Sequence, residues 1–172
     1  MNWTDLLVYI VTGGYGIIYR WGYIGLFFIS LITHVTIFFP FPNFIFIFTF
    51  GAILNPFLVG VIAALGSAIG ESTAYVIGLG GKKVLEKRYS KKINEMRKTF
   101  DKYGSVLWIF ILGATPIPDD IGGLFCGIIK YDFKKYFLAS FAGKLILSLI
   151  LAYAGHYSLN WVLNYLQWEL PS

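Results

Sequence analysis

The chain has 172 residues, of which 57% are hydrophobic and only 13% are charged, with a net charge of +5. Soluble domains are closer to half apolar and a quarter charged, so this composition excludes an ordinary soluble domain. A chain of this length cannot bury so much apolar surface internally, and lipid must surround much of it. The sequence predicts an all-α integral membrane protein.

The excess of positive charge is gathered in one segment, residues 82–103, which lies between apolar blocks. That distribution argues against nucleic acid as a partner and favours the surface of anionic membrane lipids. A single cysteine, Cys126, excludes an internal disulfide. We therefore expect membrane lipids as partners and no cofactor, and a homo-oligomer remains open.

In chain order, residues 1–20 are predicted to form an N-terminal helix, and Trp21–Phe39 an apolar helix that enters a proline break at Pro40–Asn43. The length of Trp21–Phe39 leaves open either a half-helix or a full span. The next run, Asn43–Leu54, is too short to span, since a span needs about 20 residues. Pro56 then opens a stretch to Gly81 that is long enough to cross, with proline in the first turn, where a helix tolerates it.

Residues 82–103 are predicted to form an amphipathic helix on the membrane surface. Their apolar members, from Leu85 through Tyr89 to Phe100, recur at spacings of three and four, and basic residues occupy the opposite face. That pattern is typical of an interfacial helix, and Gly104 is a suitable stop. Because Lys and Arg favour the cytoplasmic side, this segment is predicted to be cytoplasmic in a multi-pass protein of the cell membrane.

The second half of the chain repeats this order. Ser105–Thr115 is again too short to span and enters a second proline break at Pro116–Asp120. A short apolar run, Ile121–Ile129, follows, and Phe133–Tyr153 is long enough to cross the membrane. Residues 156–172 are predicted as a C-terminal helix, rich in the aromatic residues of the membrane interface.

The two proline breaks correspond to one another. A shift of 76 positions pairs Pro40 with Pro116, and Pro42 with Pro118. Paired breaks at corresponding points of two halves are typical of transporters whose binding site is built from interrupted helices. Non-helical backbone at membrane depth survives only where protein covers it or where it lines a wet cavity. These four prolines are therefore predicted to be the turns of two re-entrant hairpins that face one another.

The halves are predicted to form one membrane domain over residues 1–172, with repeat 1 at 21–81 and repeat 2 at 104–155. With residues 82–103 in the cytoplasm, the second hairpin enters from the cytoplasm and the first from outside. The expected fold is an inverted repeat of two re-entrant helical hairpins, each followed by a full transmembrane helix, with the amphipathic helix between them.

Polar residues next to the breaks are the first candidates for a substrate-binding or coupling site. Asp119 and Asp120 follow the second break, and Asn43 ends the first. Carboxylates at membrane depth are costly and by default functional, and the free N–H groups of a half-helix attract anions. The alternative is that an aspartate only caps its helix, although two adjacent carboxylates exceed what a cap needs.

Three further candidates are Glu71, Lys144 and His34. Glu71 lies mid-span among small residues that let another helix approach, and it either takes part in coupling or is a protonated structural residue. Lys144, midway along its span, is the natural counter-charge for Glu71 or the aspartates, and snorkelling to the surface is the alternative. His34 precedes the first break and is a candidate for proton handling. No ligand cluster or catalytic set lies near these residues in sequence, so we expect neither a metal site nor an enzyme.

These features resemble the DedA superfamily, also called the VTT or SNARE-associated Golgi protein domain, over roughly Ile32–Tyr157. The resemblance is closest to the small YqaA-like branch. The residues that carry it lie in the two hairpins and the two spans: Pro40, Phe41, Pro42, Gly66, Gly70, Gly78, Pro116, Asp120, Leu124, Cys126, Gly127, Gly143 and Lys144.

The resemblance implies a membrane-embedded protein with two opposed re-entrant hairpins that moves lipids between leaflets. In the main branch, arginines stand three residues before and three after the second-hairpin proline. Here those positions hold Gly113 and Asp119. Lys144 and the helix N-termini must then replace the arginines in any phosphate site.

The leading hypothesis is a lipid transporter of flippase or scramblase type that moves a phosphate-bearing lipid, such as a polyprenyl phosphate or a phospholipid. Asp119, Asp120 and Glu71 would change protonation to couple or gate the step, and Lys144 would neutralise the phosphate. One alternative is a small-ion or proton-coupled solute transporter with the same architecture. The other is a membrane-protein assembly factor that docks through the basic helix.

Overall fold

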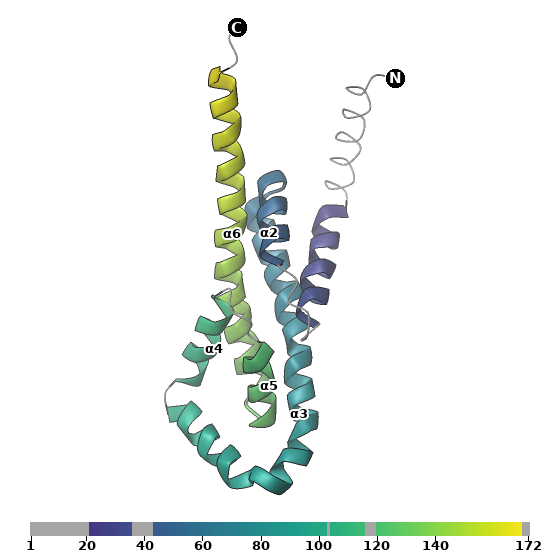
Figure 1. Ribbon diagram of the computed structural model, residues 1–172, viewed down its shortest axis with the longest axis vertical. Helices are drawn as coiled ribbons and strands as arrows, with labels where there is room; N and C mark the ends of the chain where they lie inside the picture. Colours follow the sequence, from purple (N-terminus) through teal and green to yellow (C-terminus); the bar gives the residue numbers. More distant parts are fainter. Residues whose placement is uncertain (1–20, 36–42, 103, 116–119, 170–172) are drawn as a thin grey trace.

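In the computed structural model, the described residues are 21–35, 43–102, 104–115 and 120–169, and every regular element among them is an α-helix (Figure 1). Two stretches of 26 residues each, Pro56–Gly81 and Phe133–Ser158, are long and apolar enough to cross a membrane. The all-helical prediction and the prediction of transmembrane helices are therefore supported.

The helices follow the predicted order closely. Their bounds are Trp21–Val35, α2 Asn43–Ile53, α3 Pro56–Lys102, α4 Ser105–Gly113, α5 Asp120–Ile128 and α6 Phe133–Glu169. The short runs beside the proline breaks are thus short helices, as predicted from their length. The predicted N-terminal helix over residues 1–20 and the predicted turns at Pro40, Pro42, Pro116 and Pro118 lie outside the described residues.

Two predicted helix boundaries are not observed. The basic segment that begins at Lys82 is helical, but it continues α3 without a break as far as Lys102. Likewise, α6 passes through His156, where a separate C-terminal helix was predicted to begin. No proline or capping residue stands at Lys82 or at His156. Gly80 and Gly81, just before Lys82, lower the helix propensity of the segment but do not end the helix. Figure 1 shows that α3 instead curves in its lower part.

The remaining helix ends have local causes. Gly104 adopts a positive φ of 82° between α3 and α4, so the predicted stop at this glycine is confirmed. Lys130 has a φ of 53° after α5. There the N–H of Tyr131 donates to the carbonyl of Cys126 at 2.9 Å and that of Lys130 to Gly127 at 3.1 Å. This pair of bonds is a Schellman motif, which satisfies the last carbonyls of the helix.

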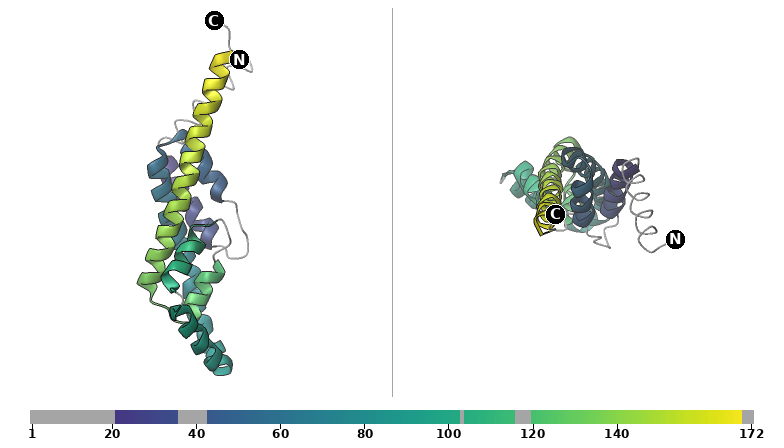
Figure 2. Two further views of the ribbon diagram at one scale, coloured as in Figure 1. Left: turned by 90° about the vertical axis from the view of Figure 1, so that its left-hand side faces the viewer. Right: turned by 90° about the horizontal axis from the view of Figure 1, so that it is seen from above.

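The short helices pack at opposite ends of a long, narrow molecule. Trp21–Val35 and α2 lie along the upper part in Figure 1, and α4 and α5 along the lower part. The side view and the end-on view in Figure 2 show α6 running through most of the length beside them. Packing is exchanged between the halves, because α2 of the first half packs on α6 and α5 of the second half packs on α3.

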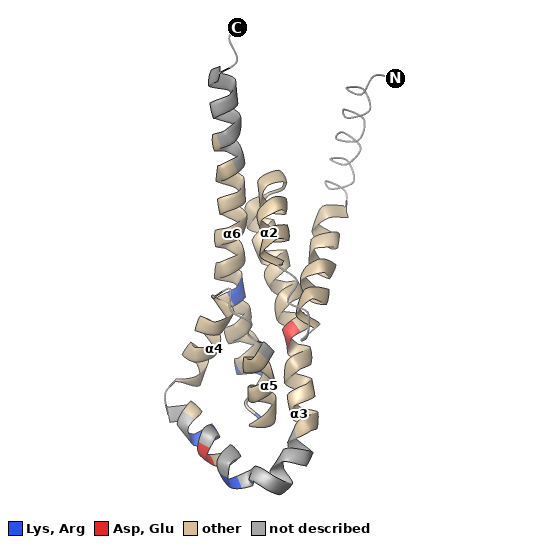
Figure 3. Cartoon of the chain, in the orientation of Figure 1, with Lys and Arg blue, Asp and Glu red and all other residues tan. Residues whose placement is uncertain are grey.

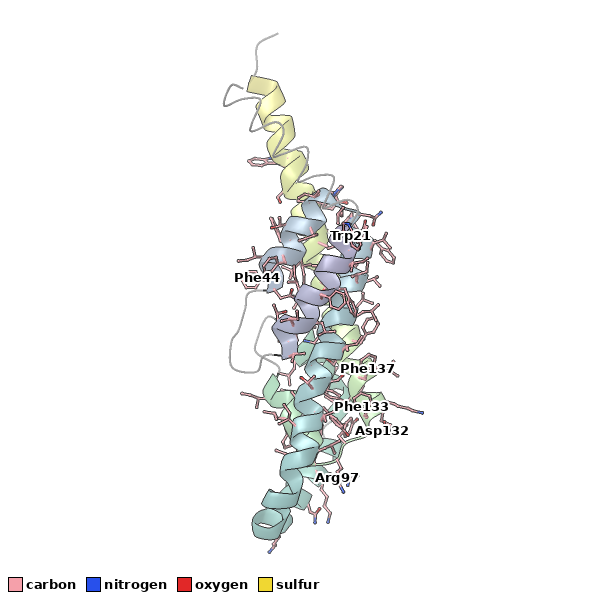
Figure 4. The ribbon with its side chains drawn as sticks, turned by 90° about the vertical axis from the view of Figure 1, so that its right-hand side faces the viewer. Trp21, Phe44, Arg97, Asp132, Phe133 and Phe137 are labelled. Carbon is pink, nitrogen blue, oxygen red and sulfur yellow. The ribbon has the colours of Figure 1, made fainter. Side chains whose placement is uncertain are left out.

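The outer surface of the helices is apolar. Trp21, Ile121 and Trp161 expose 61%, 74% and 69% of their surface. Figure 4 shows side chains, Phe44 and Phe133 among them, on the outside of the ribbon. So many exposed large apolar side chains need lipid or a partner around them. With two helices of spanning length, this surface identifies a membrane protein.

Charge is segregated along the molecule. In Figure 3 the coloured charges gather at the lower end, apart from one acid on α3 and one base on α6 near the middle. Glu71 on α3 and Lys144 on α6 are both buried. The described residues of the lower end include exposed Lys91, Arg97 and Lys134.

The cap of α6 gives a prediction for pH dependence. Asp132 Oδ1 accepts a hydrogen bond from the backbone N–H of Lys135 at 3.0 Å, and this bond, followed by that from Lys134, holds the pKa of the Asp132 carboxyl below its usual range. A carboxyl pKa that is lower in the folded state than in the unfolded state stabilises the fold above the unfolded-state pKa. This stabilisation is lost as the pH falls through the folded-state pKa. We therefore expect Asp132→Ala to lower the Tm in detergent at neutral pH and to converge with wild type in acid. A constant difference across the pH range would contradict this role of the charge.

Candidate functional site

A buried ion pair joins the two long helices near the middle of the molecule. The Nζ atom of Lys144 on α6 lies 3.4 Å from Oε2 of Glu71 on α3, and their side chains are only 6% and 4% exposed. Lys144 therefore does not snorkel to the surface. The two residues that the sequence singled out in the two spans are brought together, and each neutralises the other in a low-dielectric setting.

A serine on α6 completes this arrangement. The hydroxyl of Ser140, one turn before Lys144, donates a hydrogen bond to Oε2 of Glu71. Ser140 is itself buried. The carboxylate of Glu71 thus accepts a hydrogen bond from a hydroxyl of α6 and faces an ammonium of α6, in a place where an isolated charge would cost several kcal/mol, roughly 3 at a helix centre.

A second buried polar group fixes the beginning of α2. The side chain of Asn43 lies between two serines: Ser30 Oγ donates to its Oδ1 at 3.2 Å, and its Nδ2 donates to Ser67 Oγ at 3.2 Å. Ser30 belongs to helix Trp21–Val35 and Ser67 to α3, one turn before Glu71. Asn43 therefore ties both arms of the first predicted hairpin to α3, beside the ion pair.

His34 belongs to the same region. Its Nδ1 lies 2.9 Å from the backbone oxygen of Ser30 and 3.3 Å from Thr33 Oγ1. Helix Trp21–Val35 approaches α3 closely here, since a Cβ atom at Gly70 would come within 2.9 Å of the His34 Cβ. His34 thus faces the turn of α3 that carries Glu71.

The second predicted hairpin reaches the ion pair from the other end. At the end of α4, a Cβ atom on Gly113 would lie 3.5 Å from the backbone nitrogen of Lys144. Near the start of α5, a Cβ atom on Gly123 would lie 3.5 Å from the carbonyl oxygen of Glu71. Asp120 begins α5 one turn before Gly123. Short helices from both halves therefore end around the Glu71–Lys144 pair.

The side chains of Asp119 and Asp120 lie outside the described residues, so their part in the site stays a prediction. Among the residues that the structure describes, no group of three or more His, Cys, Asp or Glu is placed to hold a metal ion. Sequence reasoning missed three serines of the site, Ser30, Ser67 and Ser140. Two of them carried a signal, because each lies one helical turn before a predicted charged residue, and such positions share a helix face.

Comparison with known proteins identifies the family. The VTT domain model matches residues 41–157, which is more than half of the chain. An uncharacterized protein of Methanocaldococcus jannaschii is 31% identical over 130 residues, covering 73% of this chain and 79% of that protein. The vacuole membrane protein KMS2 of Arabidopsis thaliana is 28% identical over 127 residues, covering 60% of this chain but only 30% of that protein. No solved structure gives a significant match.

The chain belongs to the VTT domain family, and the resemblance to the DedA superfamily is confirmed. It is a membrane protein of this family, with two helices of spanning length.

Proposed function

We propose that the protein moves a phosphate-bearing lipid, such as a phospholipid or a polyprenyl phosphate, between the leaflets of the cell membrane without chemical change to the lipid. The observation that carries this proposal is the Lys144–Glu71 pair at the centre of the molecule, with side chains only 6% and 4% exposed. A charge at this depth is costly, and ionisable residues there mark substrate or ion pathways. In this mechanism the lipid phosphate competes with Glu71 for Lys144 while the acyl chains stay in the bilayer.

The packing of the short helices supports two opposed re-entrant hairpins. Helix Trp21–Val35 and α2 occupy one end and α4 and α5 the other (Figure 1), and all four ends turned toward the centre meet near the ion pair. The exchange in which α2 packs on α6 and α5 on α3 has the reciprocity that an inverted repeat requires. Alternating access then follows from rocking one hairpin and its packed helix against the other.

Coupling to protons is assigned to the carboxylates. When a phosphate displaces Glu71 from Lys144, Glu71 loses its counter-charge and takes up a proton. By their position in the sequence after the second proline break, Asp119 and Asp120 take up protons in the same way from the other hairpin. His34, on helix Trp21–Val35 beside the turn of α3 that carries Glu71, is a path for that proton.

The orientation gives a separate prediction. Because basic residues gather at one end, we expect Lys91 and Lys134 to face the cytoplasm and Trp21 to face outside. The test uses single-cysteine variants at these three exposed positions, with Cys126 replaced by serine, and an impermeant thiol reagent added to sealed cells. The variant at Trp21 should react, and the variants at Lys91 and Lys134 should not. Labelling of Lys91 and Lys134 positions on opposite sides would overturn the topology.

The direct test is reversal of fluorescent phospholipids between leaflets in vesicles that contain the purified protein. Wild type should speed the exchange, and Asp120→Asn should abolish it while leaving a folded protein, because asparagine still caps a helix. Lys91→Gln, on the exposed basic segment, is the matched control and should transport normally. Proton flux without lipid movement would instead favour the small-ion or solute transporter.

A further inference from the structure

A groove between α4 and α6 is open on the outside of the molecule. Its volume is about 620 Å³. The residues that line it include Val106, Leu107 and Phe110 of α4 and Lys135, Leu138 and Ala142 of α6. The small side chain of Ala142 leaves the space that a larger residue would fill.

The groove is apolar except at one end. Among the described residues of its lining, Lys135 alone is charged, and the other side chains are hydrocarbon. The neighbouring face of α4 is also apolar and exposed, with Trp108 and Ile111 at 53% and 44%. A groove surrounded by such residues opens to lipid, so the part of a ligand that fits it is hydrocarbon.

The length of the groove matches part of one leaflet. Along α6 the lining runs from Lys135 to Ala142, two helical turns or roughly 10 Å. The hydrocarbon core of a bilayer is about 30 Å thick. The groove therefore accommodates the part of an acyl chain nearest the headgroup, with Lys135 at headgroup level.

The charges near Lys135 favour an anion. Lys130 and Lys134 are also exposed at this end of α6. The one acid between them, Asp132, accepts a hydrogen bond from the backbone of Lys135 and caps the helix. The cationic side chains thus outnumber the carboxylate, and a phosphate would complement them.

We propose that the groove binds one acyl chain of an anionic phospholipid, with its phosphate against Lys135. This site is distinct from the buried Glu71–Lys144 pair and lies on the lipid-facing surface. It is the docking position of the transported lipid before that lipid reaches the centre, a role that rests on the proposed function.

The test is photo-cross-linking of the purified full chain, in vesicles, to phosphatidylglycerol that carries a photoreactive group near the headgroup end of one chain. Labelled peptides should come from α4 and the first turns of α6. Ala142→Phe, which fills the groove, should remove this labelling. Lys135→Gln should weaken it by about fivefold, since one basic residue near anionic lipid is worth about 1 kcal/mol. Phosphatidylcholine with the same group should label wild type as weakly as phosphatidylglycerol labels Lys135→Gln.

Matched controls lie outside the groove. Ala154→Phe adds the same bulk at an exposed position of α6, and Lys91→Gln removes an exposed charge on α3; both should label like wild type. Val106→Phe fills the groove from α4 and serves as a second variant, with the Tm of each variant measured to check folding.

The outcomes separate the two proposals. Labelling unchanged by both filling variants overturns the site. Wild-type lipid transport in a folded Ala142→Phe variant overturns the docking role. Specific labelling in a wild-type protein that moves no lipid supports the site and overturns the proposed function instead.

Discussion

Replacing Lys144 by methionine is expected to destabilise the protein by about 3–5 kcal/mol, the usual effect of removing one partner of a buried ion pair. The physical reason is that Glu71, whose side chain is only 4% exposed, keeps its buried negative charge but loses the ammonium at 3.4 Å. Unfolding in detergent, followed by helical signal against denaturant, measures the loss.

A double variant separates stability from function. In Glu71→Gln/Lys144→Met both charges are removed, and the glutamine amide still accepts a hydrogen bond from Ser140. Replacing a whole buried pair by groups of similar volume is often neutral or stabilising. We expect the double variant to regain most of the lost stability but none of the lipid transport, because no cation remains for the phosphate.

The controls decide what the pair does. Lys91→Met, at an exposed position of the basic part of α3, should change neither stability nor transport appreciably, since surface charges contribute little. Transport at the wild-type rate in the double variant would show that the pair is structural and would remove the observation on which the proposed function rests.

The helices were predictable from sequence because their signals are local. Runs of apolar residues interrupted by proline and glycine located α2, α4 and α5, and the structure agrees within two residues at each described end. The continuation of α3 into the basic segment was missed because hydropathy changes at Lys82 whereas helix propensity does not. The change from apolar to charged residues at Lys82 was mistaken for the end of the helix.

The site was less predictable because its residues meet only in three dimensions. Glu71 and Lys144 were found individually, since charges are rare in apolar spans. The serines were not, because a serine in an apolar helix can equally face lipid, its own backbone or another side chain, and only the position of two of them one turn before a charged residue gave a signal. Ser30, Ser67 and Ser140 acquire their roles from the helix that each one faces.

Two glycines hold the short helices against the long helices of the opposite half. A Cβ atom at Gly155 on α6 would collide with the carbonyl oxygen of Phe48 on α2, and one at Gly127 on α5 would collide with that of Tyr75 on α3. In each case the obstacle is backbone, which cannot rotate out of the way as a side chain can. Such close approach is how helices pack in lipid, where apolar burial between them contributes little.

Gly155→Ala and Gly127→Ala are therefore each expected to destabilise the protein by about 1–3 kcal/mol, toward the upper end because the whole helix must shift. Gly25→Ala and Gly80→Ala are the matched controls: both lie within helices, and a Cβ atom there meets nothing within 4 Å. These controls should be neutral or stabilising by roughly 0.5–1 kcal/mol, since alanine is the better helix former. Denaturant unfolding in detergent measures all four variants.

The same variants test whether the exchanged packing matters for transport. In a rocking mechanism, α2 moves with α6 and α5 moves with α3, so separating either pair should slow lipid exchange even in vesicles where the protein remains folded. Loss of transport in Gly127→Ala but not in Gly155→Ala would show that only one hairpin moves, which is incompatible with an inverted repeat acting by symmetry. Equal losses in both would tie the reciprocal contacts of α2 and α5 to the transport step itself.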